Sequence, residues 1–389
     1  MGLFIKGYLC NKHLLLSCFL VCAFYSSSSM VAQKSIHRQQ VLSSLLRVNS
    51  YFMEKYSDYT ATSNVGRVRP SNIWTRGVYY EGLMALYSIY PKEVFYEYAY
   101  NWSDFHQWGY RDGVVTRNAD DYCAGQTYLD LYRINQDPNC IRKVKANLDM
   151  LVNTPQDDDW WWIDAVQMGM PVFAKLGATL DEPKYWDKMW DMYEDCRNKI
   201  SGTGLFNQED GLWWRDADFI PPYQEPNGED CYWSRGNGWV YAALVRVLSE
   251  IPKDEKHYKD YVSDYMLMTK AIVKCQREDG FWNVSLHDPE NYGGKEVTGT
   301  SLFLYGLAWG VNNGLLSYEK YGPFITKAWT SIVKDAIHPN GFLGYVQGTG
   351  KEPKDGQPVT FQSMPDFEDY GIGCFLLAGV EVYKMKQYE

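Results

Sequence analysis

Apolar and polar positions along the chain follow a helical period through most of its length, and strand signals are weak. One pattern recurs, in which an aromatic or polar cluster is followed by small residues and then by an apolar stretch containing Gly or Ala. It occurs at residues 74–87, 120–132, 162–176, 233–248, 298–310 and 370–383. A helix that is apolar on all sides belongs in a protein interior, so each of these stretches is predicted to form a buried helix.

More polar, amphipathic stretches separate the buried ones. They cover residues 36–56, 91–108, 140–151, 183–200, 257–275 and 320–337. Six buried helices that alternate with six amphipathic ones predict an all-α fold, an (α/α)6 barrel of six inner and six outer helices. The uneven spacing of the repeats argues against an open solenoid or a long helical superhelix. The longest insertions precede the buried helices, which is where we expect the site.

Residues 1–32 have the features of a signal peptide. Lys6 and Lys12 supply positive charge, residues 14–24 are apolar, and a small-residue stretch ends in a predicted cleavage site after Ala32. The apolar run is short for a membrane span. We therefore expect export, to a bacterial periplasm, and no transmembrane span in the mature chain. Secretion or membrane anchoring, the latter through a lipoprotein cysteine at Cys18 or Cys22, stays an alternative.

The expected mature chain, residues 33–389, is predicted to be a single catalytic domain. A net charge of -10 and the lack of a Lys/Arg-rich block exclude a typical nucleic-acid-binding protein. The 15 Trp and 32 Tyr residues exceed what a core needs, and their flat faces suit sugar rings. No His or Cys pattern has metal-ligand spacing, so neither a metal nor another cofactor is expected. Six widely spaced cysteines outside the leader leave isolated disulfides open, and they are Cys123, Cys140, Cys196, Cys231, Cys275 and Cys374.

Polar residues stand at the starts of the buried helices, where a core has no use for them. Asp120 and Asp121 open the second helix, Asp164 the third, and Arg235 with Asn237 the fourth. Helix N-termini carry partial positive charge and unpaired N–H groups, so several of them around one cavity suit a carboxylated ligand. Arg235 adds a bidentate fork for a carboxylate.

Helix capping is the competing interpretation of these acidic residues. It applies equally to Asp120, Asp121, Glu368 and Asp369. It applies less well to Asp164, which follows three tryptophans and precedes an apolar helix. We expect Asp164 to be buried among aromatic rings, with a raised pKa that suits a general acid.

Three motifs resemble the signatures of the unsaturated glucuronyl/rhamnogalacturonyl hydrolases, glycoside hydrolase family 105, which is related to family 88. They are WSRGNGW at 233–239, WID at 162–164 and NADDYCAG at 118–125. The resemblance extends over nearly the whole expected mature chain. It implies an (α/α)6 barrel that acts on oligosaccharides from a polysaccharide lyase, whose non-reducing end carries a 4,5-unsaturated uronic acid. It also implies cleavage by hydration of the vinyl ether double bond.

The resemblance also assigns roles to residues. Asp164 corresponds to the general acid/base, and Asp120 to the second carboxylate, with Asp121 as the alternative register. Arg235 and Trp239 correspond to positions that hold the carboxylate and ring of the uronate, and Trp162 to a stacking position. The same motifs place two further candidate substrate-binding residues beside them, Trp233 and Asn237.

One segment departs from the family pattern. Rhamnogalacturonyl hydrolases carry a His in a GLxYH-like segment, whereas this chain reads GLWWRD and places Arg215 there. A cation at this position favours a sulfated neighbouring sugar, as in ulvan fragments, over plain rhamnogalacturonan.

Two other functions remain open from the sequence. An inverting glycosidase on the same barrel needs two carboxylates about 6.5–9.5 Å apart, for which Asp164 with Glu368 or Asp369 are the candidates. A non-catalytic sugar-binding protein would keep the tryptophans and would have no need of a buried Asp164.

Overall fold

Helices dominate the computed structural model, which describes residues 36–64, 67–362 and 369–388. The inner helices are α2 (Trp74–Ile89), α4 (Ala119–Asn135), α6 (Asp164–Leu180), α8 (Ser234–Glu250), α10 (Val297–Asn312) and α12 (Asp369–Lys384). The outer helices are α1 (Arg38–Lys55), α3 (Glu93–Phe105), α5 (Asn139–Val152), α7 (Lys184–Asn198), α9 (Tyr258–Lys274) and α11 (Tyr318–Asp335). The predicted alternation of buried and amphipathic helices is confirmed.

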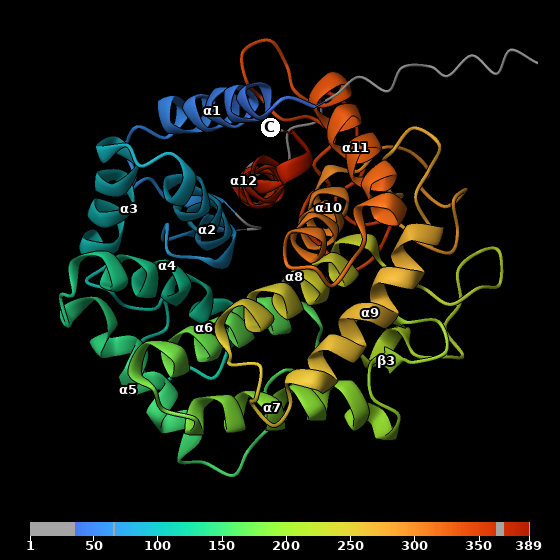
Figure 1. The fold of residues 1–389 in the computed structure, drawn as a ribbon. Helices are drawn as coiled ribbons and strands as arrows, with labels where there is room; N and C mark the ends of the chain where they lie inside the picture. The colour runs from blue at the N-terminus through green and yellow to red at the C-terminus, as the bar shows by residue number, and fades with distance from the viewer. Residues whose placement is uncertain (1–35, 65–66, 363–368, 389) are drawn as a thin grey trace, which may run out of the picture. The chain divides into compact units, whose positions relative to one another are not determined.

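The inner helices form a closed ring. Each packs against the next one in the sequence, and α12 packs against α2 to close the circle. Figure 1 shows this ring within the surrounding outer helices. The all-α barrel predicted from the sequence is therefore confirmed, and α2 lies across the ring from α8.

Small residues allow the inner helices to approach one another closely. A Cβ atom added to Gly82 on α2 would lie 2.7 Å from the backbone oxygen of Gly373 on α12. Glycine lowers helix propensity, and the close packing of α2 against α12 that it permits compensates for this loss. The outer helices have the opposite design, with a single apolar face. On α11, for example, Ile325, Trp329 and Ile332 are buried at helical spacing.

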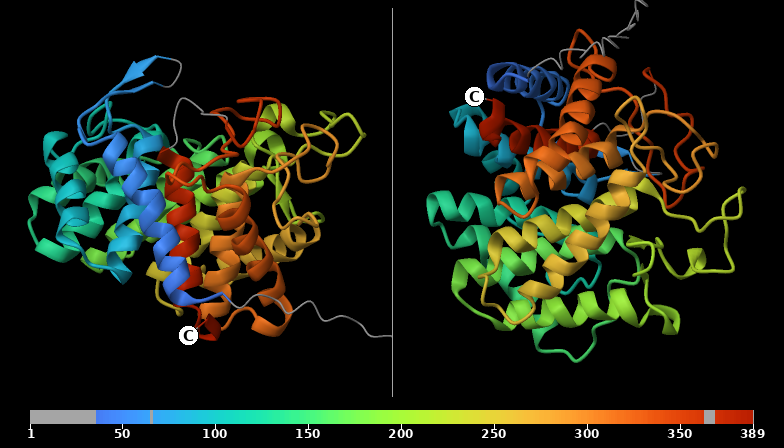
Figure 2. Two further views of the ribbon diagram at one scale, coloured as in Figure 1. Left: turned by 90° about the horizontal axis from the view of Figure 1, so that it is seen from above. Right: turned by 45° about the vertical axis from the view of Figure 1, so that its right-hand side comes forward.

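The connections differ at the two ends of the barrel. Those that leave the inner helices are short, at residues 90–92, 136–138, 181–183, 251–257 and 313–317. Those that enter them are long, at residues 56–73, 106–118, 153–163, 199–233, 275–296 and 336–368. Figure 2 (left) shows the long loops on one end of the barrel. This arrangement places the polar helix starts and the long loops on the same end.

The long loops carry the short strands of the described residues. Strands β1 (Ser63–Asn64) and β2 (Val68–Arg69) form one antiparallel hairpin, and β3 (Phe206–Asn207) and β4 (Leu212–Trp213) form another. Residues 36–389 form one compact unit. The predicted signal peptide, residues 1–32, lies outside the described residues, as do Cys18 and Cys22.

Two further observations concern only the part of the chain that the structure describes. All six of its cysteines are free thiols, and Cys275 alone among them is not fully buried. None of its helices is both long and apolar enough to cross a membrane.

Candidate active site

The start of α4 separates the two neighbouring aspartates. Asp121 is buried, accepts a hydrogen bond from Thr116 Oγ1 at 2.7 Å and forms an ion pair with Arg111 at 3.0 Å. Asp120 is half-buried, and its backbone N–H donates to the side chain of Asn118, the N-cap residue. Asp120 lines a cavity, whereas Asp121 is engaged by Thr116 and Arg111. Of the two neighbouring aspartates, Asp120 is therefore the candidate site residue.

Asp164 is the first residue of α6, and its surroundings differ from the expectation. It lies beside the guanidinium of Arg215, whose Nε is 3.1 Å from its Oδ2. Arg215 also contacts Asp216, with Nη1 2.5 Å from Oδ2. The predicted burial of Asp164 among aromatic rings is therefore wrong, because its side chain is half-buried and pairs with a cation.

Backbone pairing explains why Arg215 reaches Asp164. Trp162 and Asp216 form an antiparallel bridge, and the N–H of Ile163 donates to the carbonyl of Arg215 at 3.0 Å. The loop after β4 thus runs alongside the segment that enters α6. This contact joins residues far apart in the sequence, which is why the pattern around Asp164 gave no sign of it.

The carboxyl group of Asp120 has a raised pKa. Burial raises its pKa to about 7, and the charges of Asp164 and Asp121 act in the same direction. Arg111 and Arg215 offset part of this increase. Near neutral pH Asp120 is therefore protonated in a large fraction of the molecules, and it interacts electrostatically with Asp164.

Asp120 and Arg215 line a cavity of about 600 Å³ at the end of the barrel that carries the long loops. Its lining consists of Arg117, Asn118, Asp120, Gln156, Asp158, Asp159, Trp161, Trp162 and Arg215. Two predicted catalytic or stacking residues, Asp120 and Trp162, line it together with the predicted selector Arg215. The cavity thus combines carboxyl groups, a cation and indole rings.

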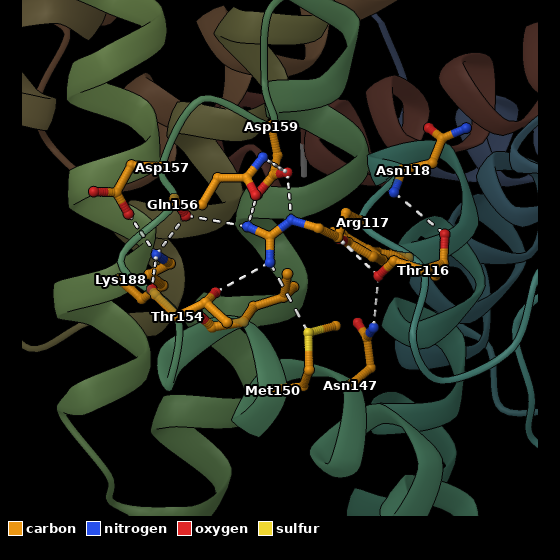
Figure 3. A network of polar contacts seen from close by, with 12 residues as sticks. Thr116, Arg117, Asn118, Asn147, Met150, Thr154, Gln156, Asp157, Asp159 and Lys188 are labelled. Carbon is orange, nitrogen blue, oxygen red and sulfur yellow. Dashed lines mark hydrogen bonds and ion pairs between the residues drawn. The ribbon is translucent and has the colours of Figure 1, made fainter.

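Arg117 clamps the loop that leads into α6. Its Nε and Nη2 bind the two carboxylate oxygens of Asp159 at 2.7 and 2.5 Å, and Nη1 donates to Thr154 Oγ1 at 3.0 Å. Lys188 on α7 donates to two backbone carbonyls of the same loop, at Thr154 and Gln156. Figure 3 shows these contacts converging on the loop. Asp159 is buried, and Arg117 compensates its charge.

Aromatic rings from different inner helices meet inside the barrel at this end. The indole of Trp74 on α2 meets that of Trp239 on α8 edge-on, with ring centroids 6.3 Å apart. The Tyr370 ring on α12 lies 5.4 Å from Trp74. Trp74 and Tyr370 were not among the predicted site residues, although both begin buried repeats. Their contact depends on ring closure between distant helices, which a local pattern does not reveal.

Arg235 faces protein backbone as well as this aromatic cluster. It is buried, and Nη1 and Nη2 donate to the carbonyls of Gln347 and Gly348 at 2.9 and 2.8 Å. Its guanidinium also lies over the rings of Trp233 and Tyr370. The predicted fork for a ligand carboxylate is therefore directed at the 347–348 segment, and its Nε has no hydrogen-bond partner among the described residues.

Two other predicted binding residues are buried in the wall of the barrel. Asn237 accepts from the N–H of Trp213 at 2.8 Å and donates to the carbonyls of Trp213 and Trp233 at 3.0 and 3.1 Å. Its amide is fully used in holding backbone, which corrects its assignment to substrate binding. Trp233 likewise donates from its indole to Gln347 Oε1 at 2.9 Å and is almost fully buried, so it does not line the cavity.

Asp369, the alternative carboxylate that the structure describes, does not line this cavity. Asp369 is buried at the start of α12 and accepts from Arg76 Nε and Thr75 Oγ1, both at 3.2 Å. Glu368 lies outside the described residues. Asp369 is thus engaged in joining α12 to α2.

A larger cavity of about 670 Å³ lies at the other ends of the inner helices. Its charged residues pair with one another, as in Lys175 with Asp130 at 2.5 Å and Arg133 with Glu250 at 2.8 Å. Because its charges are mutually compensated, we place the candidate active site in the cavity with Asp120. No group of His, Cys, Asp or Glu among the described residues is arranged to hold a metal ion.

The chain is similar to known proteins over most of its length. The sequence model of the family described as Glycosyl Hydrolase Family 88 matches residues 45–386. Over 381 residues the chain is 29% identical to a Formosa agariphila protein named unsaturated 3S-rhamnoglycuronyl hydrolase, with 93% of this chain and 95% of that protein covered.

Solved structures agree with the sequence comparison. A glycosyl hydrolase family 88 protein from Bacteroides vulgatus superposes with a TM-score of 0.81 at 30% identity, covering 89% of this chain and 99% of that chain. A second structure has the same TM-score and identity, covers 89% of this chain and 97% of that chain, and is described as a polysaccharide lyase.

Proposed function

Because this chain belongs to glycosyl hydrolase family 88, we propose that it removes a 4,5-unsaturated uronic acid from the non-reducing end of lyase-generated oligosaccharides. The chain is a glycoside hydrolase by its family and its relatives, so the hypothesis of a sugar-binding protein without catalysis is set aside. The observation that carries the proposal is Asp120, with a pKa of about 7, in a cavity that it shares with Arg215, the residue paired with Asp164.

The pair supplies one proton near neutral pH. Asp120 and Asp164 interact electrostatically, so their protons belong to the pair rather than to either residue alone. Asp164 also contacts Arg215, through its Oδ2. We assign contact with the reacting carbon to Asp164, as the family resemblance implies.

The proposed reaction is hydration of the vinyl ether. The proton held by the Asp120–Asp164 pair passes through Asp164 to C4 of the unsaturated uronate, and positive charge develops on C5 and the ring oxygen. A water molecule then adds at C5 and gives up a proton to a carboxylate of the pair. The resulting hemiketal opens and releases the neighbouring sugar, so the bond is broken without displacement at C1.

The aromatic residues suit the sugar that this reaction requires. Trp162 presents its ring beside the carboxyl pair, and Trp74, Trp239 and Tyr370 close the barrel axis at the same end. Flat apolar faces bind the planar part of an unsaturated ring, while the polar cavity wall serves hydroxyl groups.

We further propose that the neighbouring sugar is a rhamnose, in fragments of ulvan or of rhamnogalacturonan. The printed name of the Formosa agariphila relative supports a rhamnose linkage. Arg215 lines the cavity and supports a sulfated neighbour, as in ulvan. The test compares wild type and Arg215→His on sulfated and unsulfated fragments. Loss of the contact with Asp164 should lower activity on both fragments, so a larger loss on the sulfated fragment supports the proposal, and an equal change on both removes Arg215 as the selector.

We propose export to the periplasm on the basis of the charged, apolar and small residues in 1–32. Cell fractionation with an antibody to the chain tests this. A band of unprocessed size in the cytoplasm would contradict it.

Ultraviolet absorbance tests the reaction class, because the substrate contains a conjugated double bond. Hydration removes the double bond, and the absorbance falls. An inverting glycosidase would release the same sugars with unchanged absorbance, and a lyase would increase the absorbance of a saturated polysaccharide. The hydrolase proposal requires the first result alone.

A further inference from the structure

Three consecutive tryptophans leading into α6 point in alternate directions. Trp160 is 1% exposed, Trp161 is 54% exposed and Trp162 is 8% exposed. Side chains alternate in this way along extended backbone. Of the tryptophans that the structure describes, Trp161 alone is classed as exposed.

The neighbours of Trp161 hold it in this position. The ring of Trp160 packs over Gly169 on α6, where an added Cβ would lie 2.7 Å from the indole. Trp162 is paired with Asp216 across the antiparallel bridge. Since Asp159 is also fixed by Arg117, the backbone on both sides of Trp161 is anchored.

An anchored, exposed indole beside a polar cavity requires an explanation. Burying an apolar surface of this size stabilises a protein, so exposure forgoes a favourable contribution. Trp161 lines the same cavity as Asp120, and its ring lies 4.6 Å from that of Trp162. Asn118, Gln156 and Asp158 line that cavity too and offer hydrogen bonds to hydroxyl groups.

We propose that Trp161 is a stacking platform for a pyranose ring beyond the sugar that adjoins the cleaved linkage, which gives the enzyme a preference for substrates longer than a disaccharide. This inference rests on the proposed function, in which the unsaturated sugar occupies the cavity near Asp120 and Asp164. The terminal sugar then lies against the carboxyl pair, and the rest of the chain leaves over the exposed rim. Trp161 forms that rim, and its anchored backbone means that little entropy is lost when a sugar stacks on it.

The test compares an unsaturated disaccharide with an unsaturated tetrasaccharide for wild type, Trp161→Ala and Phe105→Ala. Phe105 is the matched control, because it is also 54% exposed and lies at the end of outer helix α3. For Trp161→Ala we expect the ratio of kcat/KM for tetrasaccharide over disaccharide to fall about tenfold, mainly through KM. Phe105→Ala keeps the wild-type ratio.

An unchanged ratio in Trp161→Ala, or an equal fall in both variants, would overturn the inference. Calorimetric binding with an Asp164→Asn background separates this failure from failure of the proposed function. If the tetrasaccharide binds more tightly than the disaccharide and Trp161→Ala removes the difference, the platform stands even where wild type shows no hydrolysis. If wild type hydrolyses both substrates and no difference in binding exists, the function stands and the platform is rejected.

Discussion

Arg215 Nε lies 3.1 Å from Asp164 Oδ2, although 51 residues separate the two in the chain. The same guanidinium contacts Asp216 and acts electrostatically on Asp120. A single cation from a loop thus orients one carboxylate of the site and influences the proton affinity of the other.

Replacing Arg215 with methionine should shift the pH dependence of the reaction. In wild type, activity should decline as the pH rises through about 7, because Asp120 loses the proton that the pair needs. Arg215 lowers the pKa of Asp120, so its removal should move this decline to higher pH. The maximal kcat should also fall, by about 10- to 100-fold, since Asp164 loses its orienting contact. The measurement is kcat/KM as a function of pH.

Lys256→Met is the control for this variant. Lys256 forms an exposed ion pair with Asp187 and has no contact with the cavity. An identical shift in this control, or a shift to lower pH in Arg215→Met, would contradict the electrostatic role of Arg215.

Asp120→Asn should stabilise the fold at alkaline pH. The folded-state pKa of Asp120 is raised, so the folded protein holds a proton that the unfolded chain releases between about pH 4 and 7. The free energy of unfolding therefore decreases as the pH rises from about 4 to 7. Above this range the ionised Asp120 destabilises the folded protein by the full amount. The variant removes this destabilisation, and its free energy of unfolding should exceed that of wild type near pH 8 by up to about 4 kcal/mol, the equivalent of the rise in the pKa of Asp120. Near pH 4 the difference should vanish.

Urea unfolding at the two pH values checks this prediction. Glu97→Gln, an exposed carboxylate on outer helix α3, serves as the control and should show no pH-dependent difference. A variant that is less stable than wild type at pH 8 would show that the charge of Asp120 is compensated in the folded state.

Much of this fold follows from the sequence, because each inner helix is apolar on all sides and each outer helix has one apolar face. The inner helices α6 and α8 begin within two residues of the predicted stretches at 162 and 233. The glycines within the inner helices are consistent with this pattern, because Gly82 and Gly373 lie where α2 and α12 approach each other closely. Local periodicity and composition are therefore sufficient to predict which helices are buried and where they begin.

The details of the site depended on contacts that local patterns do not contain. The partner of Asp164 comes from a loop whose register is set by the bridge between Trp162 and Asp216. The residues Arg235 and Asn237 have the predicted chemistry, but their polar groups bind backbone of other loops. Polar groups at helix starts can thus serve either the ligand or the loops, and only the tertiary structure distinguishes the two.

The ion pair between Arg117 and Asp159 should stabilise the folded protein. Asp159 is nearly buried, so Arg117→Met leaves an unpaired charge and should destabilise the protein by about 3 kcal/mol. Asp159→Asn should cost less, and the double variant should be less destabilised than the sum of the two. Urea unfolding of the four proteins gives this coupling free energy. Additive effects would show that the two side chains do not act on each other.

Asp164→Asn tests the central claim most directly. Wild type and the variant are mixed with an unsaturated disaccharide, and ultraviolet absorbance is followed together with the amount of sugar released. We predict that wild type removes the absorbance in proportion to the sugar released. The variant should show neither change, while its circular dichroism and free energy of unfolding remain close to those of wild type. Full activity in a folded Asp164→Asn protein, or sugar release by wild type at constant absorbance, would contradict the account.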